Sequence, residues 1–160
     1  MLFGPSSVVL STLLLSITAA KPLAKRSGET VYLVNCDWPG VASYSEMDYY
    51  SNGANSQNGQ QPDDGVTITA NGYETWEGHS VSGTFADSGV TFTSNIYGDA
   101  SSLADYSLAG TGHNNYGSFD CYKDNGRLLF SKGEGDNVKC SSIYYCLDVS
   151  VDPSSPDGKC

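Results

Sequence analysis

The stretch CSSIYYCLDV, residues 140–149, decides the fold class because its side chains alternate with a period of two. One face takes Ile143, Tyr145, Leu147 and Val149, and the other takes Tyr144, Cys146 and Asp148. This is the period of a β-strand, in which successive side chains point to opposite faces of the sheet. The stretch therefore predicts a strand, and it carries two of the five cysteines of the chain.

The same alternation recurs in TVYLVNC (residues 30–36), GVTITA (65–70) and GVTFTSNIY (89–97). Between the β-prone runs lie Asx-Gly pairs, which are typical of tight hairpin turns: Asn52-Gly53, Asn58-Gly59, Asp64-Gly65, Asn71-Gly72 and Asn125-Gly126. Residues 51–65 are polar without apolar anchors and are predicted to form a loop, and residues 101–110 hold one short helical turn. The pattern predicts an all-β fold, a small antiparallel β-sandwich.

The N-terminal segment of the chain predicts secretion. Residues 1–20 read as a signal peptide, with an apolar run too short to span a bilayer and a small-residue end, TAA. Residues 21–26, KPLAKR, end in a dibasic pair and read as a pro-segment that is cut after Arg26. We expect the folded domain over 27–150, a disordered tail over 151–160, an extracellular location and no membrane insertion.

The charge is strongly negative and unevenly distributed. Beyond Arg26 the chain carries eighteen acidic and five basic residues, and none of the basic ones lies between Ser27 and Tyr122. Such a surface repels phosphate backbones and anionic lipid headgroups, so the sequence argues against nucleic-acid partners. It suits solubility in an acidic medium, or the binding of a cation such as calcium.

Five cysteines in a secreted chain indicate two disulfides and one odd thiol. Four of them lie in or beside predicted strands: Cys36, Cys121, Cys140 and Cys146. Cys160 ends the tail and is taken as the odd one, with the alternative that it joins the disulfide framework or links two chains. Three pairings of the four remain open, and each bridge is expected to add roughly 2–4 kcal/mol of stability.

The stretch YETWEGHSVSGTF, residues 73–85, resembles the Greek-key hairpin of the βγ-crystallin fold. That pattern has an aromatic residue, a second aromatic five later and a glycine two beyond, and here Trp76, Val81 and Gly83 keep the spacing without the second aromatic. The resemblance implies a folded-over hairpin in which the glycine takes a conformation that a side chain would forbid. Single-domain killer toxins are similar to that fold.

The same family binds calcium through a second motif of six residues. The motif consists of two Asp or Asn residues, two residues of any type, a Ser or Thr, and a final Ser. Residues 136–141 (DNVKCS) and 63–68 (DDGVTI) resemble this motif, with Cys140 replacing a hydroxyl residue and Ile68 replacing the serine. The resemblance implies weak calcium binding, with no cofactor required, at Asp136, Asn137, Ser141, Asp63, Asp64 and Thr67.

In layout the chain resembles the fungal small secreted proteins, which act as effectors, elicitors, toxins or surface proteins. The features shared are the signal peptide, the basic-ended pro-segment and a small acidic domain rich in Tyr, Gly and Ser. This resemblance implies a monomer that binds a host or competitor target outside the cell without catalysis. It carries no catalytic residue across.

An enzyme is the alternative. Fungal guanyl-specific ribonucleases pair a Glu base with a His acid, helped by an Arg and a second His. The chain offers Glu77, His79, His113 and Arg127 for these roles. Gly78 separates the first two, and the motif strings of that family are absent. Both histidines are more simply explained as solvated turn residues.

Tyrosines and a tryptophan suggest a third function, a face that stacks on sugar rings or docks a partner protein. The candidate binding residues are Trp38, Tyr49, Tyr50, Tyr144 and Tyr145. Adjacent tyrosines on a strand point to opposite faces, so we expect one of each pair to be exposed. The partner would be an extracellular protein, or a glycan of a cell wall or matrix.

Overall fold

The computed structural model describes residues 28–149. The predicted signal peptide, pro-segment and C-terminal tail, with Cys160, lie outside the described residues. Within residues 28–149, no helix is both long and apolar enough to cross a bilayer.

The described chain is built from nine strands and three short 3₁₀ helices. The strands are β1 (Thr30–Trp38), β2 (Ala42–Tyr50), β3 (Asp64–Thr69), β4 (Ser80–Thr84), β5 (Thr91–Ile96), β6 (Leu108–His113), β7 (Ser118–Lys123), β8 (Leu128–Lys132) and β9 (Val138–Asp148). The helices are η1 (Gly53–Asn58), η2 (Ala100–Ser102) and η3 (Glu134–Asp136). All pairings between these strands are antiparallel, which confirms the all-β prediction.

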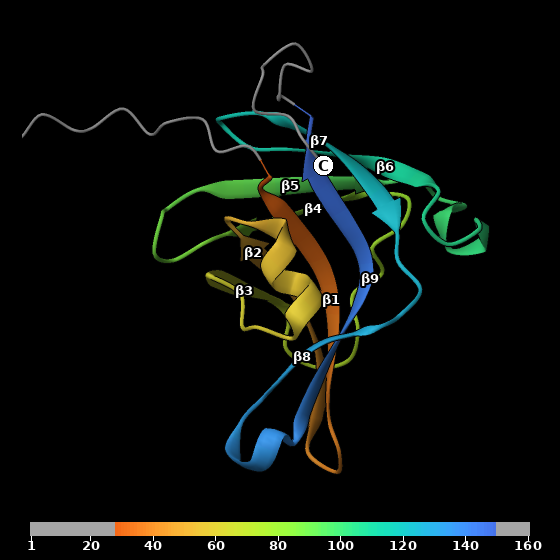
Figure 1. The fold of residues 1–160 in the computed structure, drawn as a ribbon. Coiled ribbons are helices and arrows are strands. Elements are labelled where there is room, and N and C mark those ends of the chain that lie inside the picture. The colour runs from red at the N-terminus through yellow and green to blue at the C-terminus, as the bar shows by residue number, and fades with distance from the viewer. Residues whose placement is uncertain (1–27, 150–160) are drawn as a thin grey trace, which may run out of the picture.

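The strands form one sheet, in the order β3-β2-β1-β9-β7-β6-β5-β4, that curls nearly into a barrel (Figure 1). The two separate sheets of the predicted sandwich are not seen. Instead, the edge strands β3 and β4 approach each other closely. A Cβ atom on Gly83 of β4 would lie 2.6 Å from Val66 Cγ1 and 2.8 Å from Ile68 Cδ1 of β3. Glycine is needed there because the edges of the sheet meet.

Strand β9 organises the sheet. It pairs with β1 along one side, and on the other side with β8 over its first half and with β7 over its second half. The register against β1 shifts so that Ser142 lies opposite Val34 but Tyr144 lies opposite Leu33, which leaves Ile143 as an extra residue. Such a bulge reverses the facing of the side chains that follow it. Cys140 and Cys146, which strict alternation would place together, therefore lie on opposite faces.

The two faces of β1 and β9 bury two separate hydrophobic cores. The inner core lies inside the curled sheet and includes Val31, Leu33, Trp76, Phe92 and Phe119. The outer core, of Tyr32, Val34, Cys36, Tyr50, Leu129, Phe130, Val138 and Cys140, lies between the outer face of β1–β2 and the covering strand β8. Burial on both faces explains why residues 30–34 of β1 are all buried.

Each core holds one disulfide. Cys36 pairs with Cys140 across β1 and β9 in the outer core, and Cys121 pairs with Cys146 across β7 and β9 in the inner core. In both cases the two cysteines are directly opposite in the strand register. The four predicted disulfide cysteines are confirmed, and the pairing that the sequence left open is resolved.

The stretch 73–85 is not one hairpin. Residues 73–79 close one end of the curled sheet with Trp76, which is 1% exposed and donates from Nε1 to Asn35 Oδ1 at 3.4 Å. Strand β4 begins only at Ser80. Gly78, in the connection, has a φ of +79°, whereas Gly83 does not have the positive φ that the crystallin resemblance implies.

The predicted loop at 51–65 connects β2 to β3, and it contains η1, which begins after Asn52 and buries Ser56. One local prediction is wrong. Asp64-Gly65 is not a turn but the start of β3, where a Cβ on Gly65 would lie 2.9 Å from Asp48 Oδ1.

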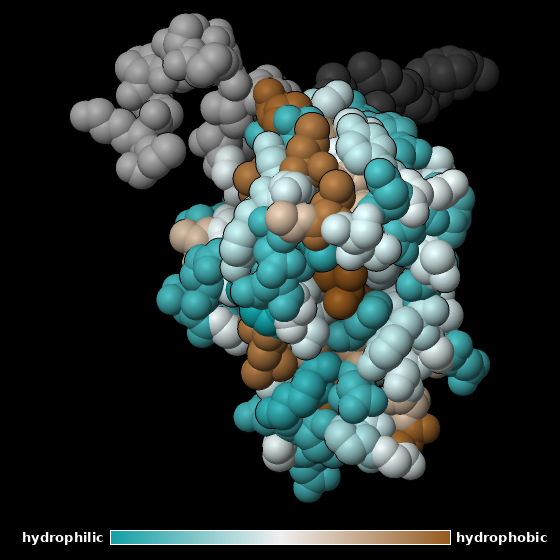
Figure 2. Space-filling view, turned by 90° about the vertical axis from the view of Figure 1, so that its right-hand side faces the viewer, coloured by the Kyte–Doolittle hydropathy of each residue, from teal (hydrophilic) through white to brown (hydrophobic). Residues whose placement is uncertain are grey.

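The face of the molecule that Figure 2 shows is mostly polar. On the face that Figure 2 shows, hydrophobic residues form a narrow, broken strip that descends from the top, surrounded by hydrophilic residues. At the bottom of Figure 1, the β1–β2 and β8–β9 connections extend beyond the body of the sheet.

Candidate functional site

The ribonuclease-like residues meet different partners. His79 is exposed, and its Nε2 lies 3.5 Å from Glu74 Oε1. The Glu77 carboxylate instead accepts a hydrogen bond from the buried Tyr144 hydroxyl at 2.5 Å, and burial together with this bond raises the pKa of Tyr144. His113 is exposed at the end of β6. Arg127 belongs to a separate network, so the four do not meet as the predicted catalytic set.

Both aspartates of the calcium motif at residues 63–68 accept hydrogen bonds from within the protein. Asp63 Oδ2 accepts from both the backbone N–H and the hydroxyl of Ser51 at 2.7 Å, and Asp64 Oδ2 accepts from the Asp87 N–H at 3.1 Å. Thr67 lies in β3, Asp136 ends η3, Asn137 follows it and Ser141 lies in β9. Calcium at either motif stays a prediction.

Within residues 28–149, one cluster of three His, Cys, Asp or Glu side chains could hold a metal ion: Cys36, Glu46 and Cys140. Both of its sulfur atoms belong to the disulfide, so the oxidised protein offers no thiolate there.

The candidate tyrosines are more buried than expected. Tyr50 and Tyr144 are buried, in the outer and inner core respectively, while Tyr49 and Tyr145 are half-buried. The expectation of one exposed tyrosine per pair is wrong because β8 and η1 cover the outer face of β1–β2. Among the five candidates only Trp38, at 40% exposure, is exposed.

A pocket of about 340 Å3 lies beside the β9 bulge, where the neighbour of β9 changes from β8 to β7. The bulge fixes the connection between those strands, since Ile143 O accepts from the Asp124 N–H at 2.9 Å and Ser142 N–H donates to Arg127 O at 3.0 Å. We call it the tyrosine–arginine pocket. Its lining includes Tyr32, Gln57, Tyr106, Asp124, Arg127, Tyr145 and Leu147.

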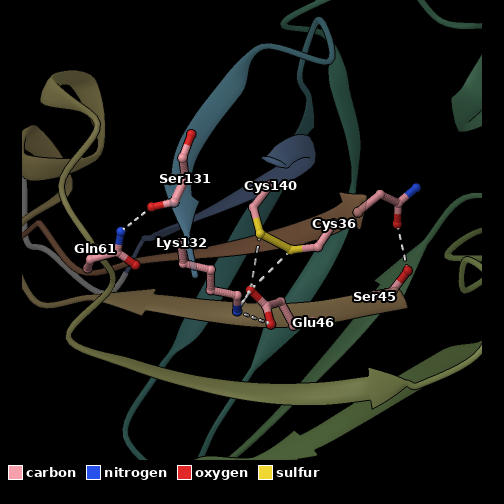
Figure 3. The surroundings of a disulfide bond; sticks show 8 residues. Cys36, Ser45, Glu46, Gln61, Ser131, Lys132 and Cys140 are labelled. Carbon is pink, nitrogen blue, oxygen red and sulfur yellow. Dashed lines mark hydrogen bonds and ion pairs between the residues drawn. A yellow bond between two sulfur atoms is a disulfide. The ribbon is translucent and has the colours of Figure 1, made fainter. Parts of the chain in front are cut away.

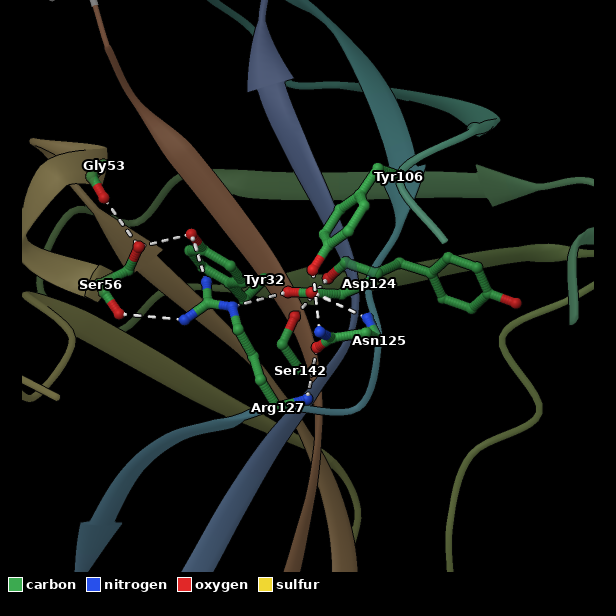
Figure 4. A network of polar contacts seen from close by, with 9 residues as sticks. Tyr32, Gly53, Ser56, Tyr106, Asp124, Asn125, Arg127 and Ser142 are labelled. Carbon is green, nitrogen blue, oxygen red and sulfur yellow. Dashed lines mark hydrogen bonds and ion pairs between the residues drawn. The ribbon is translucent and has the colours of Figure 1, made fainter. Parts of the chain in front are cut away.

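The polar side of this pocket is held rigidly (Figure 4). Arg127 donates from Nε to Asp124 Oδ2 at 3.1 Å, from Nη1 to Ser56 O at 3.2 Å and from Nη2 to the Tyr32 hydroxyl at 3.2 Å. Asp124 is 3% exposed and also accepts from the Asn125 N–H at 2.9 Å. A buried carboxylate is stable when an opposite charge and hydrogen bonds surround it, as here.

The other side of the pocket is aromatic. Tyr145 stacks on Tyr122 with ring centroids 5.5 Å apart, and it lies 6.2 Å from the Tyr32 ring. Burial, and then the charge of Asp124, raise the pKa of Tyr145. Tyr106 is exposed and has a φ of +66°, which is uncommon outside glycine and marks local backbone strain. Its hydroxyl accepts from Asn125 Nδ2 at 2.8 Å.

A second, more open groove of about 690 Å3 lies between the β1–β2 and β8–β9 connections. We call it the Trp38 groove, lined by Trp38, Tyr44, Lys132, Glu134 and Asn137 among others. Lys132, which lines the groove, donates from Nζ to both carboxylate oxygens of Glu46, at 2.7 and 2.8 Å (Figure 3). Burial alone would lower the pKa of Lys132, but the hydrogen bond and charge of Glu46 outweigh it and raise that pKa.

Glu46 is buried against the Cys36–Cys140 disulfide, with Oε1 3.2 Å from Cys36 Sγ. Asp48 lies two residues further along β2, is 1% exposed, and its Oδ2 has no hydrogen-bond partner among the described residues. Burial, and then the charge of Glu46, raise the pKa of Asp48 well above its usual range.

No protein-family model, curated protein or solved structure matches this chain. The site therefore has to be interpreted from its own geometry.

Of the residues in the tyrosine–arginine pocket, the sequence analysis identified Tyr145 as a binding residue and Arg127 as a candidate catalytic residue. It did not identify Tyr32, Tyr106 or Asp124. One signal was present: Arg127 is the only arginine after Arg26, and an acidic residue lies three positions before it, across a predicted Asn-Gly turn. A single arginine in so acidic a chain predicts a specific partner for its guanidinium.

Proposed function

We propose that the protein acts outside the cell by binding and not by catalysis, and that the tyrosine–arginine pocket binds a carbohydrate. The two disulfides are consistent with an extracellular protein, because such bonds persist in oxidising compartments. They tie β9, which carries the bulge under the pocket, to β1 and β7 on either side. The pocket therefore sits on the most strongly braced part of the sheet, as a binding site should.

The observation that carries the proposal is a fixed Asp124–Arg127 pair next to stacked tyrosine rings. A sugar presents apolar C–H faces that pack on aromatic rings, and hydroxyl groups that both donate and accept hydrogen bonds. Arg127 uses three of its five N–H donors in the bonds to Asp124, Ser56 and Tyr32, which leaves two for the hydroxyl groups of a sugar. The volume of about 340 Å3 is within the range of small-molecule sites and suits a short glycan or the end of a longer one.

A binding role agrees with the partners of the candidate catalytic residues. Glu77 accepts a hydrogen bond from Tyr144, His79 lies beside Glu74, and Arg127 holds Asp124. Each of these groups is engaged in a structural contact. We infer that a glycan-binding protein of this kind would act on the surface of a host or a competitor, in an effector- or toxin-like manner.

Glycan-array binding of the oxidised protein tests the proposal, with Tyr106→Ala and Tyr106→Phe as variants. Tyr106 lines the pocket and is 58% exposed, so its removal should spare the fold. Tyr116, 62% exposed and outside this pocket, provides the matched control Tyr116→Ala. We expect Tyr106→Ala to weaken binding at least tenfold, while Tyr106→Phe keeps the stacking and most of the affinity. Equal binding by Tyr106→Ala and Tyr116→Ala would contradict the assignment of the pocket.

The effector-like role has its own test. Purified oxidised protein is applied to plant leaf tissue and to yeast, and cell death or growth arrest is scored against a reduced and alkylated control. Activity confined to the oxidised form supports the role. Silence in both assays argues for a surface or matrix protein that binds wall polymers.

A further inference from the structure

The cluster of Cys36, Cys140 and Glu46 lines neither the tyrosine–arginine pocket nor the Trp38 groove. Each residue offers one ligand atom, and the three atoms lie within 4.8 Å of one another. Glu46 Oε1 is 3.2 Å from Cys36 Sγ and 3.6 Å from Cys140 Sγ (Figure 3). All three residues are buried. We call them the sulfur–carboxylate cluster.

The pairing of three strands brings the cluster together. Cys36 of β1 lies directly opposite Cys140 of β9, with the two Cα atoms 4.0 Å apart. Glu46 lies on β2, which pairs with β1 along its other edge. The backbone hydrogen bonds between these strands do not involve the S–S bond. A folded protein in which that bond is reduced therefore keeps the three side chains on one face of the sheet.

Reduction would turn the two sulfur atoms into metal ligands. A phosphine reductant breaks the S–S bond and takes up the oxygen atom of one water molecule, and the sulfur atoms receive the electron pair and the two protons. Zn²⁺ then displaces both thiol protons into the solvent, because the thiolate is the form of cysteine that binds metals. In a tetrahedral zinc site, with bonds of about 2.3 Å, the two sulfur atoms lie roughly 3.8 Å apart. Rotation of the two side chains provides this spacing once the S–S bond is broken.

The charges of the cluster suit a divalent ion that accepts both sulfur and oxygen. Lys132 Nζ donates to both oxygens of Glu46, and each carboxylate oxygen has a lone pair for a second partner. Glu46 can therefore bind a metal ion while Lys132 stays in place. Two thiolates and Glu46 carry three negative charges, and Zn²⁺ with Lys132 carries three positive charges, so these groups balance as burial requires. Ca²⁺ does not fit, because its ligands are oxygen atoms.

The Trp38 groove offers a path from solvent to the cluster. Lys132 and Val138 line the groove, Lys132 contacts Glu46, and Val138 packs in the outer core with both cysteines. Three protein ligands leave the fourth tetrahedral position to a water molecule on this side. We propose that the reduced protein binds one Zn²⁺ ion through the sulfur–carboxylate cluster. The inference is independent of the proposed carbohydrate site, since the two sites share no residue.

Zinc titration of the reduced protein tests the proposal. Cys160→Ser first removes the odd thiol of the chain. Because the disulfide is buried, the protein is reduced with a phosphine in urea and refolded with the reductant present, with and without Zn²⁺. Competition with a chromophoric chelator should give one ion per chain and a Kd of about 1 μM or lower. About 100 μM Zn²⁺ should raise the melting temperature of the reduced protein and leave that of the oxidised protein unchanged.

Two cysteine variants, both made in the Cys160→Ser background, show which pair of thiols binds the ion. Cys36→Ser/Cys140→Ser should abolish zinc binding by the reduced protein. The matched control Cys121→Ser/Cys146→Ser removes the other pair and should retain the binding. Zinc binding that the two variants share equally, or that the control alone loses, would overturn the proposal.

A second pair of variants tests the carboxylate and does not depend on the folding of the cysteine variants. Glu46→Gln should weaken zinc binding at least tenfold, because a neutral amide is a poorer ligand than a carboxylate. Glu134→Gln, at an exposed acidic residue of the Trp38 groove, should leave the affinity unchanged. Unaltered affinity in Glu46→Gln, or a reduced protein that neither binds Zn²⁺ nor refolds with it, would also overturn the proposal.

Discussion

Replacing Lys132 with methionine should destabilise the protein in a pH-dependent manner. Lys132 Nζ donates to both oxygens of Glu46, whose side chain is 5% exposed and lies against the Cys36–Cys140 disulfide. Methionine preserves much of the length and apolar stem of lysine but removes the charge. The Glu46 carboxylate would then be buried without its cation, beside Asp48, which is itself buried.

The size of the effect follows from the burial of the pair. Removing one partner of a fully buried ion pair costs about 3–5 kcal/mol, because the remaining charge is left uncompensated. Lys132 is 36% exposed, so water screens the pair in part and the lower end, about 3 kcal/mol, is expected at pH 7. That is a large share of the 5–15 kcal/mol typical of a domain. The double variant Lys132→Met/Glu46→Gln should recover most of the loss.

Urea unfolding of the wild type and both variants at pH 7 and at about pH 3.5 measures these free energies. The loss in the variant is the cost of a buried carboxylate charge without its cation, and a carboxyl group carries that charge at pH 7 but loses it in acid. The deficit should therefore be larger at pH 7 than at about pH 3.5. A loss under 1 kcal/mol at pH 7, or an equal loss at both pH values, would refute the account of Glu46 as a buried charge held by Lys132.

Three further predictions concern stability. Asp48→Asn should raise the free energy of unfolding at pH 7 but not at about pH 3.5, as measured by chemical denaturation. The pKa of Asp48 is raised by burial, so the wild type loses stability as the pH rises and this carboxyl group ionises, and the asparagine variant does not. Gly83→Ala should lower the free energy of unfolding by about 1–3 kcal/mol, because its Cβ would lie 2.6 Å from Val66 Cγ1. The control Gly98→Ala should be nearly neutral, because its Cβ would lie 3.8 Å from the nearest atom. Equal effects of the two substitutions would contradict the close approach of β3 and β4. Removing the Cys36–Cys140 disulfide, which spans 104 residues, should lower the stability by about 4–5 kcal/mol, and removing Cys121–Cys146, which spans 25, by about 3–4 kcal/mol. The longer loop should cost more because its closure restricts the unfolded chain more. Thermal melting of the two paired alanine variants compares the losses, and a larger loss for Cys121–Cys146 would contradict this explanation.

Period-two alternation was sufficient to predict four of the strands and the fold class, because one face of each stretch is apolar. It was insufficient for β2, where polar and apolar residues are mixed: Met47 enters the inner core while Glu46 and Asp48 are buried on the other face. These two buried acidic residues interrupt the apolar face of β2, so the alternation is not visible there. Strand β8 and helix η1 cover the outer face of β1–β2, and this covering layer explains why the tyrosine pairs do not expose one ring each.

The bulge at Ile143 is the main reason why the site could not be predicted. Sequence alternation continues through residue 143 without a visible break, yet the facing of the side chains reverses there. The bulge also holds the connection that carries Asp124 and Arg127. Arg127 then meets Tyr32, which lies 95 residues away in the chain, and no local pattern reports a contact of that range.

The NMR signal of the Arg127 Nε–H group tests the central claim most directly. Arg127 is the only arginine among the described residues, and its guanidinium lies inside the tyrosine–arginine pocket against Asp124. A glycan identified on the array is titrated into labelled protein while this signal and the backbone amides are followed. The account predicts that the Arg127 signal shifts and saturates together with the amides of Tyr106 and Tyr145. Saturable shifts around Trp38 and Lys132, with an unmoved Arg127 signal, would contradict it.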